Sequence, residues 1–125
     1  GGKGKIEARN RTFKAGQIRE SAGIRFGLIT DAPFVPIEGQ LLQAALYVKN
    51  GLSREMALKC LTINNAIITD IDSRVGSLEP GKDADVVIWD VEPLATLSQV
   101  GIVIIDGQIA YRRKAGESNV DYQKL

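Results

Sequence analysis

The chain has 125 residues, 44% of them hydrophobic and 25% charged, with a formal net charge of +1. These totals are typical of one small globular domain, and no apolar run approaches the roughly 18–20 residues of a membrane span. The single cysteine excludes a disulfide within the chain, and the absence of histidine excludes every site in which this chain supplies an imidazole base or metal ligand. Because residues 1–10 lack the apolar core of a signal peptide, we expect a cytoplasmic protein.

Basic residues are concentrated before residue 26, where seven Lys or Arg stand against two Glu. A basic stretch can bind nucleic acid, but this one holds a single aromatic residue, Phe13, and no groove-reading motif. We therefore predict a solvated loop and helix face here, with neither nucleic acid nor a membrane as partner.

The first predicted elements are a loop over residues 1–10 and a helix over residues 11–22 that ends at Gly23. We expect three residues of this helix to face the core: Phe13, Ile18 and Ala22. Residues 24–30 are a short run of β-favouring residues, which predicts a strand. A helix, a strand and a further helix in succession indicate a parallel α/β sheet.

Asp31 stands where this predicted strand ends and a loop with Pro33 begins. At the C-terminal end of a strand in a β/α barrel, a carboxylate is a candidate catalytic residue. Aspartate also starts turns before proline, so this stretch by itself leaves both interpretations open.

A loop over residues 32–37 leads into a predicted helix over residues 38–49, which Asn50-Gly51 ends. The helix has a wide apolar face: Leu41, Leu42, Ala45, Leu46 and Val48. Such a face predicts that the helix covers a core.

Ser53 is the predicted cap of a second helix over residues 54–61, in which Cys60 is a packed core thiol. The residues expected to point inward are Ala57, Cys60 and Leu61. A third, short helix is predicted over residues 66–71. Its candidate caps are Thr62 and Asn64.

From residue 74 onward strand periodicity replaces helical periodicity, which predicts a sub-domain boundary between residues 71 and 74. Residues 74–83 are rich in turn formers, and residues 114–125 form a polar tail that we expect to be mobile. The predicted strands are residues 84–90, 100–105 and 108–112, the last two joined by a turn at Asp106-Gly107. Three acidic residues are expected to face solvent along the first strand: Asp83, Asp85 and Asp90.

Residues 76–82 match the phosphate-binding pattern G-x-x-x-x-G-K, but Asp83 replaces the Ser or Thr that would bind magnesium. Glu79 would repel a phosphate, and a strand rather than a helix follows the loop. We therefore reject a nucleotide site.

Four stretches carry a resemblance to a known family. Residues 74–85 read RVGSLEPGKDAD before VVIWD, residues 51–66 read GLSREMALKCLTINNA, residues 30–33 read TDAP, and residues 103–107 read VIIDG. These stretches resemble, respectively, four features of the amidohydrolase superfamily: the G-x-[IL]-x-x-G-x-x-A-D-[LV] signature, the helix pair, the last barrel strand and the closing hairpin. The resemblance is to the imidazolonepropionase and prolidase-like branch of this superfamily. Asn65 stands where the helix-pair pattern has proline.

The resemblance implies an α/β fold: the last strand and helices of a (β/α)8 amidohydrolase barrel over residues 1–72, plus the C-terminal part of a composite β-sandwich over residues 73–113. It implies that Asp31 is a metal ligand and a catalytic residue, which takes a proton from the attacking water and passes it to the leaving group. The implied cofactor of the intact protein is a divalent metal, zinc by expectation.

This chain lacks the family's metal-binding histidines and the ~250 residues of a whole barrel. We therefore expect the C-terminal portion of a metal-dependent amidohydrolase acting on a non-peptide C–N bond (amide or cyclic amide), with no activity and no bound metal when alone. The expected partners are a small-molecule amide, the remainder of the amidohydrolase chain, and a second copy that pairs through Trp89, Val87 and residues 102–105. The alternative is a non-catalytic interaction or assembly module derived from this fold.

Overall fold

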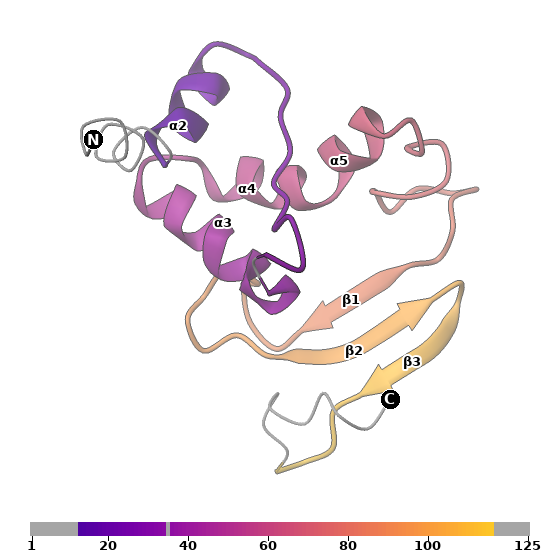
Figure 1. The fold of residues 1–125 in the computed structure, drawn as a ribbon. Helices are drawn as coiled ribbons and strands as arrows, with labels where there is room; N and C mark the ends of the chain where they lie inside the picture. The colour runs from indigo at the N-terminus through magenta and orange to yellow at the C-terminus, as the bar shows by residue number, and fades with distance from the viewer. Residues whose placement is uncertain (1–12, 35, 117–125) are drawn as a thin grey trace.

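The computed structural model describes residues 13–34 and 36–116, in which helices come first and an antiparallel sheet follows (Figure 1). The helical elements are α2 (Lys14–Ser21), the 3₁₀ turn η1 (Ile37–Gly39), α3 (Gln40–Lys49), α4 (Arg54–Leu61) and α5 (Ile63–Ile68). The strands are β1 (Val86–Trp89), β2 (Val100–Ile105) and β3 (Gln108–Arg112). The predictions for residues 1–10 and for the tail beyond residue 116 lie outside the described residues. In the part of the chain described here, no helix combines the length and the apolar character needed to cross a membrane.

Helix α2 packs on the core through Gly16, with Phe13 just before it, rather than through Ile18 and Ala22. Gly16 is buried, and a Cβ atom there would lie 2.7 Å from the Tyr47 ring. Phe13 meets the same ring edge-on, with 5.2 Å between the centroids, so its expected inward position is confirmed. The predictions for Ile18, which is 65% exposed, and for Ala22, also exposed, were wrong. The reason is that the residue without a side chain permits the closest approach, which turns Ile18 away from the core.

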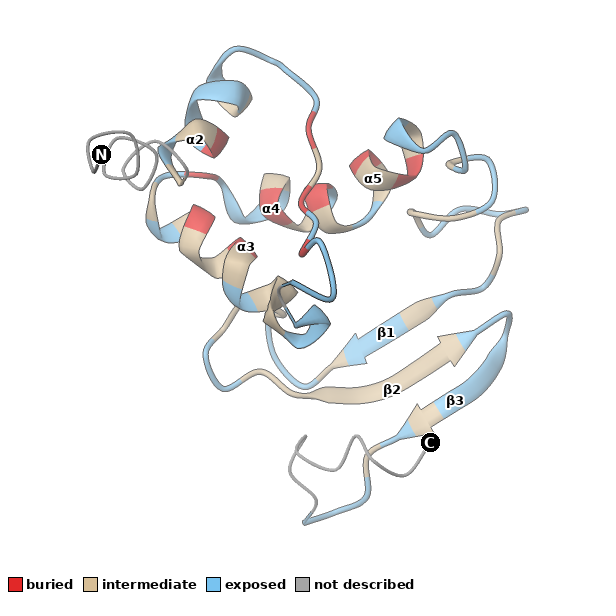
Figure 2. Ribbon diagram, viewed as in Figure 1, coloured by how far each residue is buried: buried red, intermediate tan, exposed pale blue. Residues whose placement is uncertain are grey.

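Helix α3 begins two residues later than predicted, because the tighter 3₁₀ turn η1 occupies residues 37–39. Its buried residues are Ala44 and Tyr47, whereas Leu42, expected on the apolar face, is 65% exposed. Figure 2 shows the buried residues on the helices and on the segment before α3. The predicted end at Asn50-Gly51 is confirmed, since Gly51 adopts the positive φ of 103° that suits a helix terminus.

Helix α4 has the predicted bounds, and the Ser53 hydroxyl accepts a hydrogen bond from the Met56 N–H at 3.1 Å, which confirms the cap. Its buried residues are Ala57 and Cys60. Helix α5 begins three residues before the predicted range of 66–71. Thr62 precedes it without capping it by its side chain, because the Thr62 hydroxyl donates to the Leu58 carbonyl at 2.8 Å.

Residues 24–30 are extended but form no strand among the described residues, so the strand predicted there is absent from them, and its place in a whole barrel stays a prediction. Strand pairing needs a neighbour, and none of the residues described pairs with this segment. Phe26, Leu28 and Thr30 are nevertheless buried, while Ile29 between the last two is 68% exposed. This alternation is the period of two that a strand presents. The local backbone preference was therefore predicted correctly, and the pairing expected in a barrel stays a prediction.

The sheet has the order β1-β2-β3 with antiparallel neighbours. Val103 of β2 is its centre, paired with Val87 on one side and Tyr111 on the other. β1 is shorter than the predicted range of 84–90. The predicted turn at Asp106-Gly107 is confirmed, with φ of 50° and 76°, as a type I′ hairpin requires. All residues of the three strands are half-buried or exposed (Figure 2), so the sheet lacks a covered face in the described structure.

The carboxylates near β1 form contacts that the solvent-facing prediction did not include. Asp83 Oδ2 pairs with Arg74 Nη2 at 2.6 Å. Asp85 Oδ1 accepts a hydrogen bond at 2.9 Å from the backbone N–H of Asp106 in the hairpin turn. Asp85 and Asp90 are exposed, as expected, but both of their carboxylates accept backbone hydrogen bonds that join β1 to the chain around β2.

Candidate functional site

Asp31, the residue that the sequence singled out, lies at the end of the extended segment and at the start of the turn toward α3. Its backbone has φ of 57°, in the left-handed region that Asp adopts more readily than most residues. Its carbonyl accepts a hydrogen bond from the Phe34 N–H at 3.1 Å. Asp31 is exposed, whereas Thr30 before it is only 8% exposed. The turn is therefore present, and it brings the acidic residue from a buried segment out to solvent.

Groups from three helices hold the segment that leads to this residue. The Leu28 N–H donates to the Cys60 carbonyl of α4 at 3.0 Å. The Leu28 carbonyl accepts from Asn65 Nδ2 of α5 at 3.0 Å and from Gln40 Nε2 of α3 at 3.3 Å. The Phe26 carbonyl, two residues before Leu28, accepts from Asn64 Nδ2 of α5 at 2.9 Å. Helical groups thus satisfy backbone groups that a neighbouring strand would otherwise satisfy.

The sequence did not identify these amide side chains as part of the site. The sequence predicts Asn64 only as a candidate helix cap, whereas the structure places it as a buried residue inside α5. Asn65 carried a signal, because it stands where the resemblance has proline, a residue with no side-chain donor. Gln40 is an ordinary helix former, and nothing in its position along the chain distinguishes it.

The described residues do not by themselves fit a metal ion. Within residues 13–34 and 36–116, no three His, Cys, Asp or Glu side chains are grouped so that they could hold one. Asp31 offers one carboxylate, whereas catalytic zinc takes about three protein ligands. A metal at Asp31 would therefore need ligands from other polypeptide, and no catalytic step through a metal follows from these residues.

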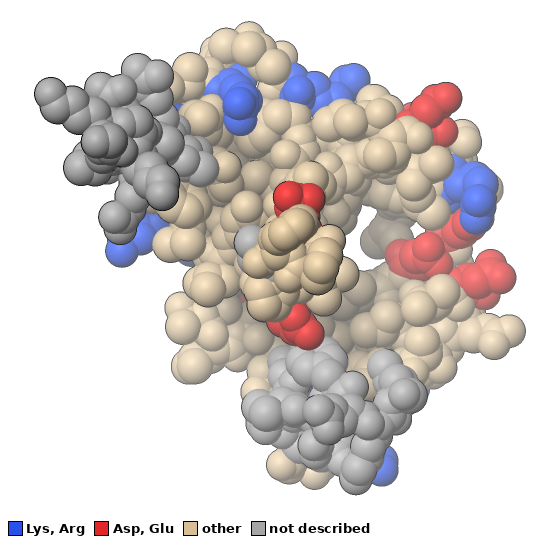
Figure 3. Space-filling view, viewed as in Figure 1, with Lys and Arg blue, Asp and Glu red and all other residues tan. Residues whose placement is uncertain are grey.

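A hollow of about 570 Å³ separates the helices from the sheet. Figure 3 shows the surface hollowed in this region. Leu61 and Ala66 line it from the helical side, and Val87 and Trp89 line it from β1. Asp85 is the one charged residue in the lining, so the hollow is chiefly apolar. Such a surface is suited to contact with other polypeptide rather than with water.

The rejection of a phosphate loop at residues 76–82 agrees with the contacts in it. Lys82 Nζ pairs with Glu79 at 2.9 Å and donates to Ser77 Oγ at 2.7 Å. The hydrogen bond from Ser77, followed by the Lys82 charge, lowers the pKa of the Glu79 carboxyl. The loop then leads to β1 instead of a helix, so it has neither a free lysine nor a helix N-terminus for a phosphate.

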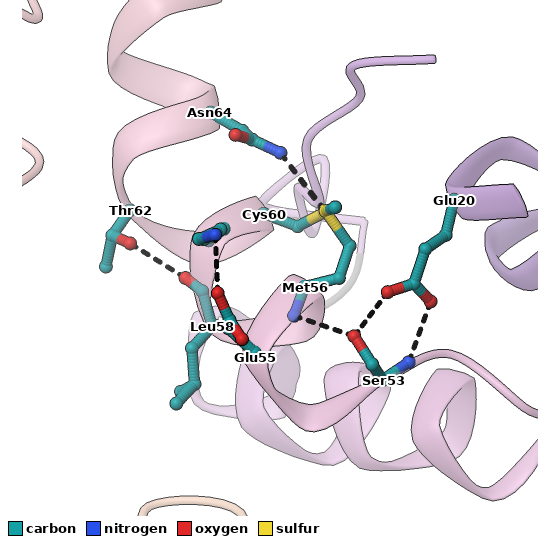
Figure 4. A network of polar contacts seen from close by, with 9 residues as sticks. Glu20, Ser53, Glu55, Met56, Leu58, Cys60, Thr62 and Asn64 are labelled. Carbon is teal, nitrogen blue, oxygen red and sulfur yellow. Dashed lines mark hydrogen bonds and ion pairs between the residues drawn. The ribbon is translucent and has the colours of Figure 1, made fainter. Parts of the chain in front are cut away.

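Cys60 is a core thiol, as predicted, but it has a polar neighbour. It has no exposed surface, and burial raises the pKa of its thiol. Asn64 Nδ2 lies 3.7 Å from Cys60 Sγ (Figure 4). Because Cys60 has no exposed surface, its thiol is out of reach of a substrate in the described structure, and we do not include it in the candidate site.

Comparisons with known proteins agree with the resemblance. The model of the amidohydrolase family matches residues 8–110. An imidazolonepropionase from Picrophilus torridus is 49% identical over 41 residues, which are 33% of this chain. The crystal structure of an amidohydrolase from Thermotoga maritima is 39% identical and matches 82% of this chain with a TM-score of 0.77. A Xaa-Pro dipeptidase, 24% identical over 81% of this chain, has a TM-score of 0.67 and is similar in fold.

The chain spans only part of these proteins. It covers 10% of the imidazolonepropionase, 27% of the Thermotoga maritima chain and 25% of the dipeptidase chain. The family match nevertheless includes most of the described residues, among them Asp31, the helices around it, β1, β2 and the first part of β3. Sequence signature, fold and family model agree, and this chain belongs to the amidohydrolase family.

Proposed function

We propose that this chain is the C-terminal portion of a metal-dependent amidohydrolase that hydrolyses a C–N bond in a small molecule. The observation that carries the proposal is Asp31, an exposed carboxylate at the end of a buried extended segment, in a chain of the amidohydrolase family. A carboxylate in this place is suited to accept a proton from an attacking water and to return it to the leaving nitrogen.

The metal in this proposal is zinc, and Asp31 is the residue of this chain that would contact it. Zinc would supply Lewis acidity to the intact enzyme, and its remaining ligands would come from the rest of the amidohydrolase polypeptide. Because the described residues contain no cluster of ligands, the chain alone should be inactive and should not retain zinc.

The unfilled apolar surfaces support the proposal that further polypeptide completes the fold. The hollow of about 570 Å³ and the uncovered sheet are surfaces that a lone domain rarely leaves to solvent, and segment 24–30 has no strand neighbour among the described residues. In our proposal, residues 1–72 complete a (β/α)8 barrel and residues 73–113 complete a β-sandwich with strands from elsewhere in the enzyme. Alone, the chain associates with a second copy. We place the enzyme in the cytoplasm.

The names of the similar proteins favour a broad substrate class. One relative is named imidazolonepropionase, and one protein of similar fold is named Xaa-Pro dipeptidase. We therefore propose a C–N bond of the amide or cyclic amide type, and we do not carry forward the expected restriction to non-peptide bonds. The alternative of a non-catalytic module is one outcome of the test below.

The test is a chimera in which this chain replaces the part of the Thermotoga maritima amidohydrolase that it matches. We expect the chimera to bind zinc and to hydrolyse a panel of amides, and the 125-residue chain with added zinc to do neither. Asp31→Asn should lower kcat by roughly 10²–10⁴-fold.

Asp70→Asn is the matched control, because Asp70 is also exposed and has φ of 60°, close to the 57° of Asp31. Asparagine tolerates this backbone region as aspartate does, so both variants should fold. An inactive chimera, or equal activity in the two variants, would support the non-catalytic module and contradict the proposed function.

A further inference from the structure

We propose that Asn65 is a positioning residue for Asp31: through its hydrogen bond to the Leu28 carbonyl it sets the place of the segment that presents the carboxylate. The inference deepens the proposed function and rests on it for the catalytic part of its test. Asn65 is not proposed to touch the substrate.

The first argument is that Leu28 is the point where three helices meet the extended segment. Both of its backbone polar groups are bonded to helical partners, its N–H to Cys60 and its carbonyl to Asn65 and Gln40. At about 3.3 Å per residue of extended chain, Leu28 is about 10 Å along the backbone from Asp31. An anchor this near the end of the segment limits how far Asp31 can move.

The second argument is the geometry of the two side-chain bonds to the Leu28 carbonyl. Here the bond from Asn65 Nδ2, at 3.0 Å, is shorter than the 3.3 Å bond from Gln40 Nε2 to the same oxygen. Asn65 also belongs to the short helix α5, where the resemblance has proline, so the donor is a feature of this chain.

The third argument is the close fit between Asn65 and Gly27. A Cβ atom at Gly27 would overlap Asn65 Oδ1 and lie 2.9 Å from Asn65 Cγ. The next neighbour, Ile68 Cδ1, would be at an ordinary 3.5 Å. The glycine is therefore matched to the asparagine side chain, and an alanine there would push the amide away from the Leu28 carbonyl.

The first part of the test measures stability in the full 125-residue chain and does not depend on activity. We compare Gly27→Ala, Asn65→Ala and the double variant by thermal unfolding. Each single change should lower the midpoint by roughly 3–6 °C, since each removes the same hydrogen bond. The double variant should be no less stable than either single one, because alanine at 65 leaves room for the new methyl group. Additive losses would show that the two side chains do not meet and would overturn the inference.

The second part measures catalysis in the chimera with the Thermotoga maritima amidohydrolase. Asn65→Ala and Gly27→Ala should each lower kcat by roughly 10–100-fold with KM within about twofold, as expected when a reacting group is displaced. Asn50→Ala is the matched control, because Asn50 Nδ2 also donates to a backbone carbonyl, that of Leu46, at 2.8 Å at the far end of α3. It should lower the midpoint and leave kcat within about twofold.

The two failures can be told apart. If Asp31→Asn abolishes activity but Asn65→Ala leaves kcat unchanged, the positioning role is wrong and the proposed function stands. If Asp31→Asn has no effect while the Gly27–Asn65 coupling is present, the proposed function is wrong and the contact is purely structural. A loss of kcat in Asn50→Ala equal to that in Asn65→Ala would overturn the positioning role, because general destabilisation would then explain both.

Discussion

Ser53 joins two helices, and Ser53→Ala should lower the free energy of unfolding by about 1.5 kcal/mol. Its hydroxyl accepts from the Met56 N–H at 3.1 Å and donates to the Glu20 carboxylate, which reaches from α2 to the start of α4 (Figure 4). Loss of the cap costs about 1 kcal/mol. The bond to Glu20 joins exposed groups, so its loss adds only about 0.5 kcal/mol. The Ser53 N–H, which donates to Glu20 at 2.9 Å, remains in the variant.

Ser53→Asp separates the two contributions. Aspartate caps a helix as well as serine does, but it removes the hydroxyl donor and places a second carboxylate beside Glu20. The variant should therefore be less stable than wild type, and adding Glu20→Ala should recover most of the loss.

Urea unfolding followed by far-UV circular dichroism measures these differences, at a protein concentration where light scattering gives a constant mass. A loss below about 0.5 kcal/mol in Ser53→Ala would refute the assigned cap. Equal stability of Ser53→Asp with and without Glu20 would refute the contribution of the contact between α2 and α4.

Two further predictions follow from the sheet. The Gln99 N–H donates to Asp90 Oδ1 at 2.8 Å, and this bond, with a smaller effect of Arg113, lowers the pKa of Asp90. The ionised Asp90 therefore stabilises the fold above the unfolded-state pKa, which is near 4. This stabilisation is lost as the pH falls toward the lower folded-state pKa. Urea midpoints should therefore fall more steeply below pH 4 in wild type than in Asp90→Asn, and parallel curves would contradict this account. Light scattering of the chain alone should show a mass that rises with concentration. Val87 is 48% exposed and lines the hollow, so Val87→Lys should reduce this rise in mass. Val91 is 54% exposed and lies outside the lining, so Val91→Lys should leave the rise unchanged. A clean monomer at high concentration would contradict the association.

The elements that the sequence predicted correctly depend on local chemistry. Helix α4 has its predicted bounds because Ser53 caps it, and α3 ends as expected because Gly51 permits a positive φ. The hairpin at Asp106-Gly107 forms because both residues accept the left-handed region. The family was also identified from sequence motifs alone, and Asp31 was found at the end of an extended segment, although its role there stays a prediction.

Tertiary structure decided the features that depend on distant neighbours. Residues 24–30 have the alternation of a strand but no pairing, since a strand requires a partner that the described chain does not provide. α2 packs through Gly16 because the shape of the Tyr47 ring, and not the hydrophobicity of Ile18, sets the closest approach. The hydrogen bond from Asn65 to the Leu28 carbonyl depends on the packing of α5 against the extended segment, which the sequence does not reveal.

The sequence was enough to find Asp31 at the end of a buried segment. It could not show how firmly Asp31 is held, because the hydrogen bond between Asn65 and Leu28, 37 positions apart, forms only after the helices pack. The comparison of Asn65→Ala with Asn50→Ala therefore tests the positioning role. A loss of kcat in Asn65→Ala alone would support this role, and equal kcat in the two variants would contradict it.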